Sequence, residues 1–228
     1  MIALDKRNQR IQIMFSSIAR RYDLMNAIMT FGQDARWRRE VIRRAKLSPG
    51  SHLLDLGTGT GDLAREALIQ QPACTVTAAD YTLAMMQVGN KRGRLDWSAA
   101  DALHLPFPNE SFHTIVSGFL LRNVFDVPLS LREQFRTLKP GGRIIILDTT
   151  QPSKNMLYPL IWIHLHWVIP VIGRLFSRQP DAYNYLIEST DTFLKAEQLA
   201  DAMQEAGFRQ VGFQRKMFGT IAIHWGQK

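Results

Sequence analysis

The stretch HLLDLGTGTGD, residues His52–Asp62, decides the fold of this chain. Its first half is apolar enough to form a buried strand, and its second half is a glycine turn of the kind that opens a helix. A further apolar run, Thr75–Ala79, ends at the acidic residue Asp80. A glycine turn lets bare backbone approach a ligand, and a carboxylate after the next strand can hold a ribose. The stretch therefore predicts a nucleotide-type cofactor site in an α/β fold.

The spacing of the glycines indicates which cofactor binds. A dinucleotide fingerprint needs glycine at its first, third and sixth positions, but here Gly57, Gly59 and Gly61 alternate and Asp62 takes the sixth position. A carboxylate at that position would repel a diphosphate. A turn lined by Asp55 and Asp62 suits the positive sulfonium of S-adenosylmethionine, which carries no phosphate. A glycine turn alone is weak support, because many α/β proteins use one simply to turn tightly.

Two more strands are predicted to end beside this turn. The pattern predicts a helix over 62–71, a third strand over 95–100 that ends at Asp101 and Ala102, and a fourth over 113–118 that ends at Gly118. Because parallel strands end at the same edge of a sheet, Asp80, Asp101 and Gly118 should meet there. Any single acid after a strand is more readily explained as a helix cap or turn residue, but three in register are harder to explain in this way.

Composition is typical of an enzyme that folds around one core. The chain has 228 residues, of which 46% are hydrophobic and 21% charged, and we expect one domain. Cys74 is the only cysteine, so no disulfide and no cysteine-rich zinc site is expected, and no metal site is predicted. The start, MIALDKRNQR, is charged where a secretory signal needs an apolar core. These features predict a cytoplasmic location.

The net charge of +8 is concentrated near the N-terminus. Residues 1–46 hold eleven Lys or Arg and four Asp or Glu, and we treat them as a basic helical cap. The apolar residues of this segment fall at helical spacing, which predicts one buried face and an outward face at Arg20 and Arg21; they are Ile11, Met14, Phe15, Ile18, Ala19 and Tyr22. The basic face can meet RNA, anionic lipid or only water.

A second unusual segment is Met156–Gly173, eighteen residues without a charged side chain, within an insertion of about 153–190. Spanning a bilayer takes roughly 20 apolar residues, and Pro159 and Pro170 argue against a continuous helix. A lid over a hydrophobic substrate or an interfacial helix pair fits better, with Trp162 and Trp167 suited to the headgroup level. An ordinary buried core helix is the alternative.

The C-terminal part completes the predicted fold. Lys195–Ala206 is an amphipathic helix that ends before Gly207, and Phe208–Lys216 and Thr220–Gly226 are two strands joined by a turn at Phe218 and Gly219. Alternating strands and helices followed by a closing hairpin predict a doubly wound, mostly parallel seven-stranded sheet with an antiparallel C-terminal edge.

Four further motifs carry a resemblance that covers essentially the whole chain. They are YDLMNAIMTFGQDARWRRE at Tyr22–Glu40, GFLLRNVFD at Gly118–Asp126, RTLKPGGRIIILDTTQP at Arg136–Pro152, and YLIESTDTF with the closing GTIAIHWGQK. The chain resembles the ubiquinone/menaquinone biosynthesis C-methyltransferases of the UbiE/MenG type. The resemblance implies a class I methyltransferase fold and methyl transfer from S-adenosylmethionine to the ring of a prenylated quinol, most often demethylmenaquinol.

The resemblance also assigns residues. Thr60, Asp80, Asp101 and Ala102 would contact the cofactor, with Gly118 where relatives often have Ser; Arg122 and Asn123 would face the methyl group and the ring. Tyr22, Asp23 and Asn26 would close the pocket. Arg122 would stabilise a ring phenolate, since a phenol with a pKa near 10 is protonated at neutral pH. The proton acceptor stays open between Asp23, His224 and an ordered water. For His224, a role as a structural strand residue is slightly favoured.

Departures from the family pattern fall on the substrate side. Where relatives have Ser, His and Trp, the chain has Thr30, Asp34 and Trp37. Trp37, which matches the family, is a candidate contact of the substrate. Elsewhere Leu120 replaces a glycine and Asp148 a glutamate. A different quinone or ring position is therefore open. The alternatives are methylation of another small hydrophobic molecule or of RNA, and a non-catalytic scaffold of a membrane enzyme complex. We expect peripheral contact with the inner face of the cell membrane and no nucleic acid partner. Whether the protein forms a homodimer stays open.

Overall fold

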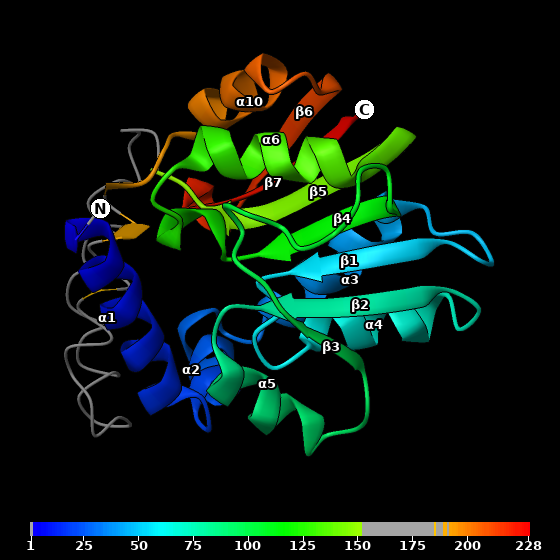
Figure 1. The fold of residues 1–228 in the computed structure, drawn as a ribbon. Helices are drawn as coiled ribbons and strands as arrows, with labels where there is room; N and C mark the ends of the chain where they lie inside the picture. Colours follow the sequence, from blue (N-terminus) through cyan, green and yellow to red (C-terminus); the bar gives the residue numbers. More distant parts are fainter. Residues whose placement is uncertain (1, 152–184, 186–188, 191) are drawn as a thin grey trace.

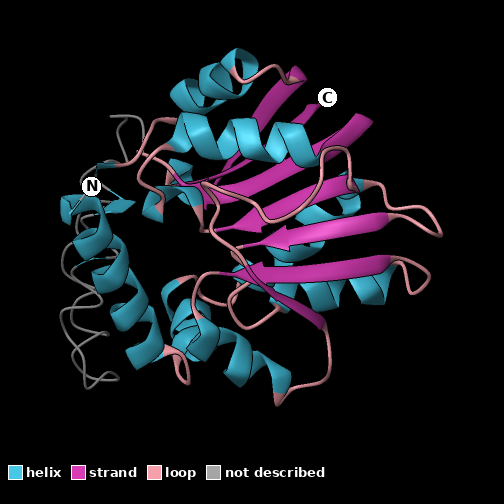
Figure 2. Cartoon of the chain, viewed as in Figure 1, coloured by secondary structure: helices cyan, strands magenta, loops and turns pink. Residues whose placement is uncertain are grey.

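Seven strands form one sheet in a computed structural model that describes residues 2–151, 185, 189–190 and 192–228 (Figures 1 and 2). The strands are β1 (His52–Leu56), β2 (Thr75–Asp80), β3 (Asp96–Ala99), β4 (Phe112–Gly118), β5 (Leu138–Thr149), β6 (Arg209–Lys216) and β7 (Ile221–Gln227). Their order across the sheet is β3-β2-β1-β4-β5-β7-β6. The order reverses between β1 and β4, and ligands of doubly wound sheets bind at the carboxyl edge of such a reversal.

Six of the seven strands point the same way. β1 pairs in parallel with β2 and β4, and β5 extends this parallel set, whereas β7 pairs antiparallel with both β5 and β6. The mostly parallel sheet with a C-terminal hairpin is thereby confirmed. The antiparallel strand itself is β7, which lies one place inside the edge, and β6 forms the edge.

Helices cover both faces of the sheet. The described helices are α1 (Ile2–Ile18), α2 (Tyr22–Met29), α3 (Asp34–Ala45), α4 (Asp62–Gln70), α5 (Leu83–Asn90), α6 (Val127–Thr137) and α10 (Ala196–Glu205). On one face α3 and α4 bury Val41, Ala64 and Ala67 against the sheet. On the other face α6 and α10 bury Leu131 and Leu199. Two hydrophobic cores therefore hold the strand ends, and the turns that follow them, in fixed positions.

The N-terminal cap is made of three helices. Gly32, at φ +70°, lies in the turn between α2 and α3. As predicted, Ile18 and Ala19 are buried, while Arg20 and Arg21 are exposed. Figure 1 shows α1 standing across the carboxyl ends of the strands, next to α2 and α5. The cap therefore closes the edge of the sheet at which the sequence places the cofactor.

The predicted insertion of about 153–190 lies almost entirely outside the described residues. The apolar run Met156–Gly173 falls outside the described residues. Among the helices that are described, none is both long and apolar enough to cross a membrane.

Candidate active site

The glycine turn between β1 and α4 forms the floor of a cavity. Gly57 and Gly59 line this cavity, and both have positive φ, +67° and +59°, which favours glycine. A Cβ atom at Gly57 would lie 2.7 Å from Cδ1 of Leu120. Gly61, at φ +87°, begins α4 and packs against Arg65 and Leu95, without lining the cavity. The turn thus exposes backbone at two of its three glycines and uses the third for helix packing.

Asp55 supports this turn from behind. It is fully buried, and its Oδ2 accepts hydrogen bonds from the hydroxyl of Thr58 (2.6 Å) and from the backbone N–H of Ala64 (2.9 Å). Burial raises the pKa of Asp55 to about 7. Its Oδ1 has no hydrogen-bond partner among the described residues, and Asp55 also lines a second, smaller cavity. Asp55 thus braces the turn with one oxygen, and its role as an anionic wall of the cofactor site stays a prediction.

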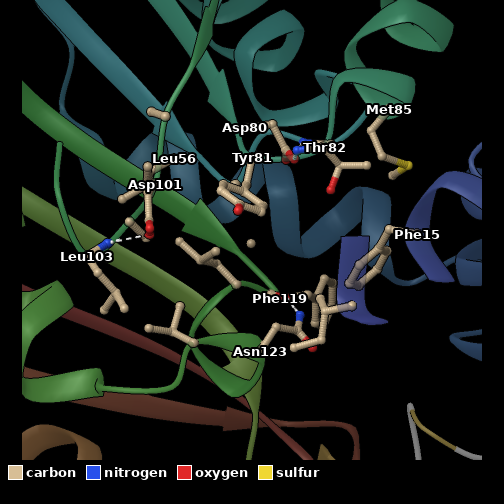
Figure 3. Close-up of a pocket in the computed structure, with 18 of the residues that line it drawn as sticks. Phe15, Leu56, Asp80, Tyr81, Thr82, Met85, Asp101, Leu103, Phe119 and Asn123 are labelled. Atoms are coloured by element: carbon tan, nitrogen blue, oxygen red, sulfur yellow. Dashed lines mark hydrogen bonds between the residues drawn. The ribbon is translucent and has the colours of Figure 1, made fainter. Parts of the chain in front are cut away.

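The carboxylate that faces the cavity is Asp80, at the end of β2 (Figure 3). It is 9% exposed, and each oxygen accepts one backbone N–H: Gly59 donates to Oδ2 over 2.8 Å and Thr82 to Oδ1 over 2.7 Å. Burial raises the pKa of Asp80, and these hydrogen bonds oppose that effect. Carboxylate oxygens have about four acceptor sites, so Asp80 keeps acceptor capacity at the cavity.

The third strand end adds Asp101 and Ala102, which also line the cavity. Oδ1 of Asp101 accepts the backbone N–H of Leu103 over 2.9 Å, which fixes the turn after β3. Gly118, at the end of β4, lines the same cavity. The sequence prediction that three strand ends meet at one edge is confirmed by these positions.

An aromatic and apolar wall closes the other side of this cavity, which encloses about 850 Å³ of empty space, part of it open to solvent. In Figure 3, Phe15 from α1 and Phe119 after β4 lie on the side of the cavity away from Asp101, and Asn123 is drawn beneath Phe119. Phe119 has φ +58°, a strained conformation for a bulky residue. Nδ2 of Asn123 donates to the carbonyl of Phe119 over 2.9 Å and so stabilises this turn.

Tyr22 connects the first cavity with a second, smaller one. The second cavity holds about 410 Å³ of empty space, and both cavities share Tyr22, Gly57, Gly59, Gly118 and Phe119. Burial raises the pKa of Tyr22, although the positive charge of Arg122 opposes this effect and Asn26 hydrogen-bonds its hydroxyl. Asn26 lines the second cavity, as the sequence prediction of a closing N-terminal side requires.

Two arginines neutralise the acids around the second cavity. Arg92 pairs with Asp23 (2.7 Å) and with Asp62 (2.8 Å), and Arg38 also pairs with Asp62 (2.7 Å). Asp62 is therefore paired with two cations, and the argument that it makes the turn anionic stays a prediction. Thr60, predicted to contact the cofactor, donates its hydroxyl to Asp23 over 2.7 Å and lines only the second cavity of the two.

Arg122 lies in the single 3₁₀ turn η1, Leu121–Asn123, which follows β4. Its side chain is 7% exposed, its guanidinium carbon lies 5.2 Å from the centre of the Phe119 ring, and its Nε lies 4.0 Å from Oδ1 of Asp148. Among the described residues, Nε has no hydrogen-bond partner. Arg122 is not among the residues that line either cavity, although its neighbours Leu120 and Asn123 line the first.

Two predicted residues lie away from the cavities. His224 is 1% exposed in the middle of β7, where its Nε2 lies 2.9 Å from the carbonyl of Ala196 in α10, and burial lowers its pKa to about 4. His224 lines neither cavity, and this position favours the structural strand residue over the proton acceptor. Trp37 is 4% exposed in the core beneath α3, so it is not a substrate contact.

Other residues of the site were not predicted as such. Met85, Tyr81 and Phe125 line the first cavity, together with Ile11 and Phe15, which the sequence identified only as one face of a helix. Tyr185 donates its hydroxyl to Oδ1 of Asn123 over 3.1 Å. The only sequence signal for Tyr185 was its place in the motif YLIESTDTF.

Comparison with known proteins identifies the family of this chain. The profile of the ubiE/COQ5 methyltransferase family matches residues 3–228. The ubiquinone/menaquinone biosynthesis C-methyltransferase UbiE of Desulfotalea psychrophila is 45% identical over 221 residues, covering 96% of this chain and 90% of that protein. The demethylmenaquinone methyltransferase of Roseiflexus castenholzii is 37% identical, with 98% and 95% covered.

Solved structures confirm the fold. A SAM-dependent methyltransferase of Thermotoga maritima, described as a possible histamine N-methyltransferase, superposes with a TM-score of 0.65 at 20% identity and covers 94% of this chain and 98% of its own. At this identity the likeness concerns the fold alone. The sequence matches, by contrast, run almost end to end, and the chain belongs to the ubiE/COQ5 methyltransferase family.

Proposed function

We propose that this protein transfers a methyl group from S-adenosylmethionine to a ring carbon of a prenylated quinol, with demethylmenaquinol as the favoured substrate. Family membership and the names of its relatives support the reaction class. The observation that carries the proposal is a cavity edged by Asp80 and Asp101 at one end and by Phe15, Phe119 and Asn123 at the other. It offers polar anchors for a nucleoside next to apolar walls for an aromatic ring.

The residues of the first cavity fit the adenosine half of S-adenosylmethionine. Asp80 retains acceptor sites for a vicinal diol, and Gly57 and Gly59 present no Cβ atom toward the ligand. The second cavity is lined by charges of both signs, from Asp23, Asp62 and Arg38, which suits a zwitterionic amino acid group. When bound, S-adenosylmethionine would supply the electrophilic methyl group.

Arg122 is proposed to activate the acceptor. Ring carbon becomes a good nucleophile when the neighbouring hydroxyl loses its proton, and a buried guanidinium with a free donor stabilises the resulting oxyanion. Burial and Asp62 raise the pKa of Asp23, which makes it a better proton acceptor than an exposed carboxylate. Asp23 and an ordered water are the two acceptors that remain, and the apolar walls exclude other water.

Membrane contact is proposed for the N-terminal cap. Ile13 on α1 and Leu24 on α2 are 69% and 59% exposed, and Arg20 and Arg21 between them are exposed too. Exposed apolar and basic side chains next to a cavity for a prenylated substrate favour peripheral contact with an anionic lipid surface. We expect the protein to sediment with vesicles that contain anionic lipid, and Ile13→Ser with Leu24→Ser to release it. Equal binding of both proteins would contradict this contact.

The test of the reaction is mass spectrometry of the quinone pool in cells that lack this protein. We expect quinones that lack one ring methyl group, and restoration by the wild type. Arg122→Ala should fail to restore the pool, since removal of one transition-state donor costs about a hundredfold in rate. Arg36→Ala, which removes an exposed arginine on α3, is the matched control and should restore it. An unchanged pool in the deletion strain would refute quinol as the substrate.

A further inference from the structure

Asn123 presents an amide whose orientation is fixed from two sides. Its Nδ2 donates to the carbonyl of Phe119 over 2.9 Å, and its Oδ1 accepts the hydroxyl of Tyr185 over 3.1 Å. The two contacts agree on which end of the amide is oxygen, because one partner is a carbonyl acceptor and the other a hydroxyl donor. The side chain therefore has a defined orientation at the wall of the first cavity.

In this orientation Asn123 keeps one N–H donor that no described residue uses. An asparagine amide has two N–H donors on Nδ2, and the carbonyl of Phe119 uses one of them. Asn123 lines the cavity, and in Figure 3 it lies beneath Phe119 at the aromatic end. The second N–H is thus available to an oxygen in that part of the cavity.

From these contacts we propose that Tyr185 is a positioning residue: its hydroxyl holds the Asn123 amide so that the second N–H is directed at an oxygen of the bound acceptor ring. Tyr185 acts through Asn123 and does not itself line either of the two cavities. Without the phenol hydroxyl, Oδ1 loses a donor and the amide can rotate about its terminal bond, whose torsional wells are broad. The inference rests on the proposed function, since it assigns a donor to the same acceptor site.

The test is the isosteric variant Tyr185→Phe combined with Asn123→Ala. With a short-chain demethylmenaquinol, Tyr185→Phe should lower kcat/KM about fivefold, the size expected from one lost hydrogen bond. Asn123→Ala should lower it at least as much, and the double variant should match Asn123→Ala alone, because both changes remove the same interaction. Binding of S-adenosylhomocysteine by calorimetry should stay unchanged in Tyr185→Phe.

A spectroscopic readout separates this inference from the proposed function. In ¹⁵N-labelled protein, the side-chain NH₂ resonances of Asn123, identified by their loss in Asn123→Ala, should shift or broaden in Tyr185→Phe. Unmoved resonances, multiplicative kinetic effects, weaker donor binding or loss of the folded state would each overturn the positioning role. Wild-type protein that methylates no quinol, with the resonances shifting as described, would overturn the proposed substrate and restrict Tyr185 to orienting the amide.

Discussion

Three aspartates lie at or near the carboxyl ends of neighbouring strands, yet their surroundings differ. Asp55 braces the turn and lines only the second cavity, whereas Asp80 and Asp101 line the first. Only Asp80 combines burial with two backbone donors, and such a carboxylate is held rigidly in place. At the scale of single residues, donor binding should therefore depend mainly on Asp80.

Replacement of Asp80 tests this dependence. Asp80→Ala removes the acceptor for a ribose diol, and we expect the affinity for S-adenosylhomocysteine in calorimetry to fall by at least about tenfold, the effect of losing charge-assisted hydrogen bonds. Asp201→Ala removes an exposed aspartate from α10 and should leave the affinity unchanged. Equal affinities of the two variants would show that Asp80 does not hold the donor.

His224 makes a prediction about stability and pH. Its pKa is lowered from 6.5 to about 4 by burial, so the unfolded chain takes up the proton first as the pH falls. The contribution of His224 to the free energy of unfolding is complete above pH 6.5 and decreases toward pH 4, by roughly 3 kcal/mol in total. Asp55, whose pKa is raised to about 7, acts in the opposite direction, because its contribution decreases as the pH rises from about 4 to 7.

Comparing the wild type with His224→Gln isolates the contribution of this histidine to stability. Urea unfolding of the wild type and of His224→Gln at pH 7 and pH 5 gives four free energies, and the wild type should lose more stability between these pH values than the variant does. The same loss in both proteins would mean that His224 is not held neutral in the folded state.

At the scale of elements, a ladder of ion pairs joins the cap to the glycine turn. Arg38 of α3 bridges Asp34, at 3.0 Å, and Asp62 at the start of α4, and Arg92 after α5 joins Asp62 to Asp23 of α2. The Arg38 side chain is 16% exposed and that of Asp34 is 5% exposed, so this end of the ladder is poorly screened by solvent. The cap should consequently be fixed most firmly at Arg38.

Removal of Arg38 should therefore destabilise the protein strongly. Arg38→Met leaves the buried carboxylate of Asp34 without its cation, and the free energy of unfolding should fall by about 3 kcal/mol. Arg36→Met, a change on the exposed side of the same helix, should alter it by less than about 0.5 kcal/mol. Chemical denaturation measures both values, and similar losses for the two variants would contradict a cap held by this ladder.

The helices and strands also show which parts of the fold could be predicted from sequence patterns. The strands around His52–Asp62 and the convergence of their ends could be predicted, since parallel strands share a carboxyl edge and apolar runs identify buried strands. The position of β7 inside the edge could not be predicted, because hairpin strands pair with whichever neighbour their register allows. The roles of Thr60 and Asp62 could not either, since their partners Asp23, Arg38 and Arg92 are distant in sequence.

At the scale of the whole molecule, three parts of the chain that are distant in sequence form the site. The strand edge supplies Asp80, the cap supplies Tyr22 and Phe15, and Tyr185 reaches Asn123 from the C-terminal half. Motif resemblance identified Tyr22 and Asn123, but it also pointed to Trp37 and His224, whose side chains face the cores. A motif marks a stretch of chain, and only packing shows which of its side chains reaches the cavity.

The central claim is that this cavity brings a methyl donor and a quinol ring together. The most direct measurement uses the purified protein with trideuteromethyl S-adenosylmethionine and reduced demethylmenaquinol, followed by mass spectrometry of both products. The account predicts one trideuteromethyl group on a ring carbon and an equal amount of S-adenosylhomocysteine, with product formation lowered about a hundredfold by Arg122→Ala. Wild-type protein that binds the donor but leaves the quinol unlabelled would contradict it.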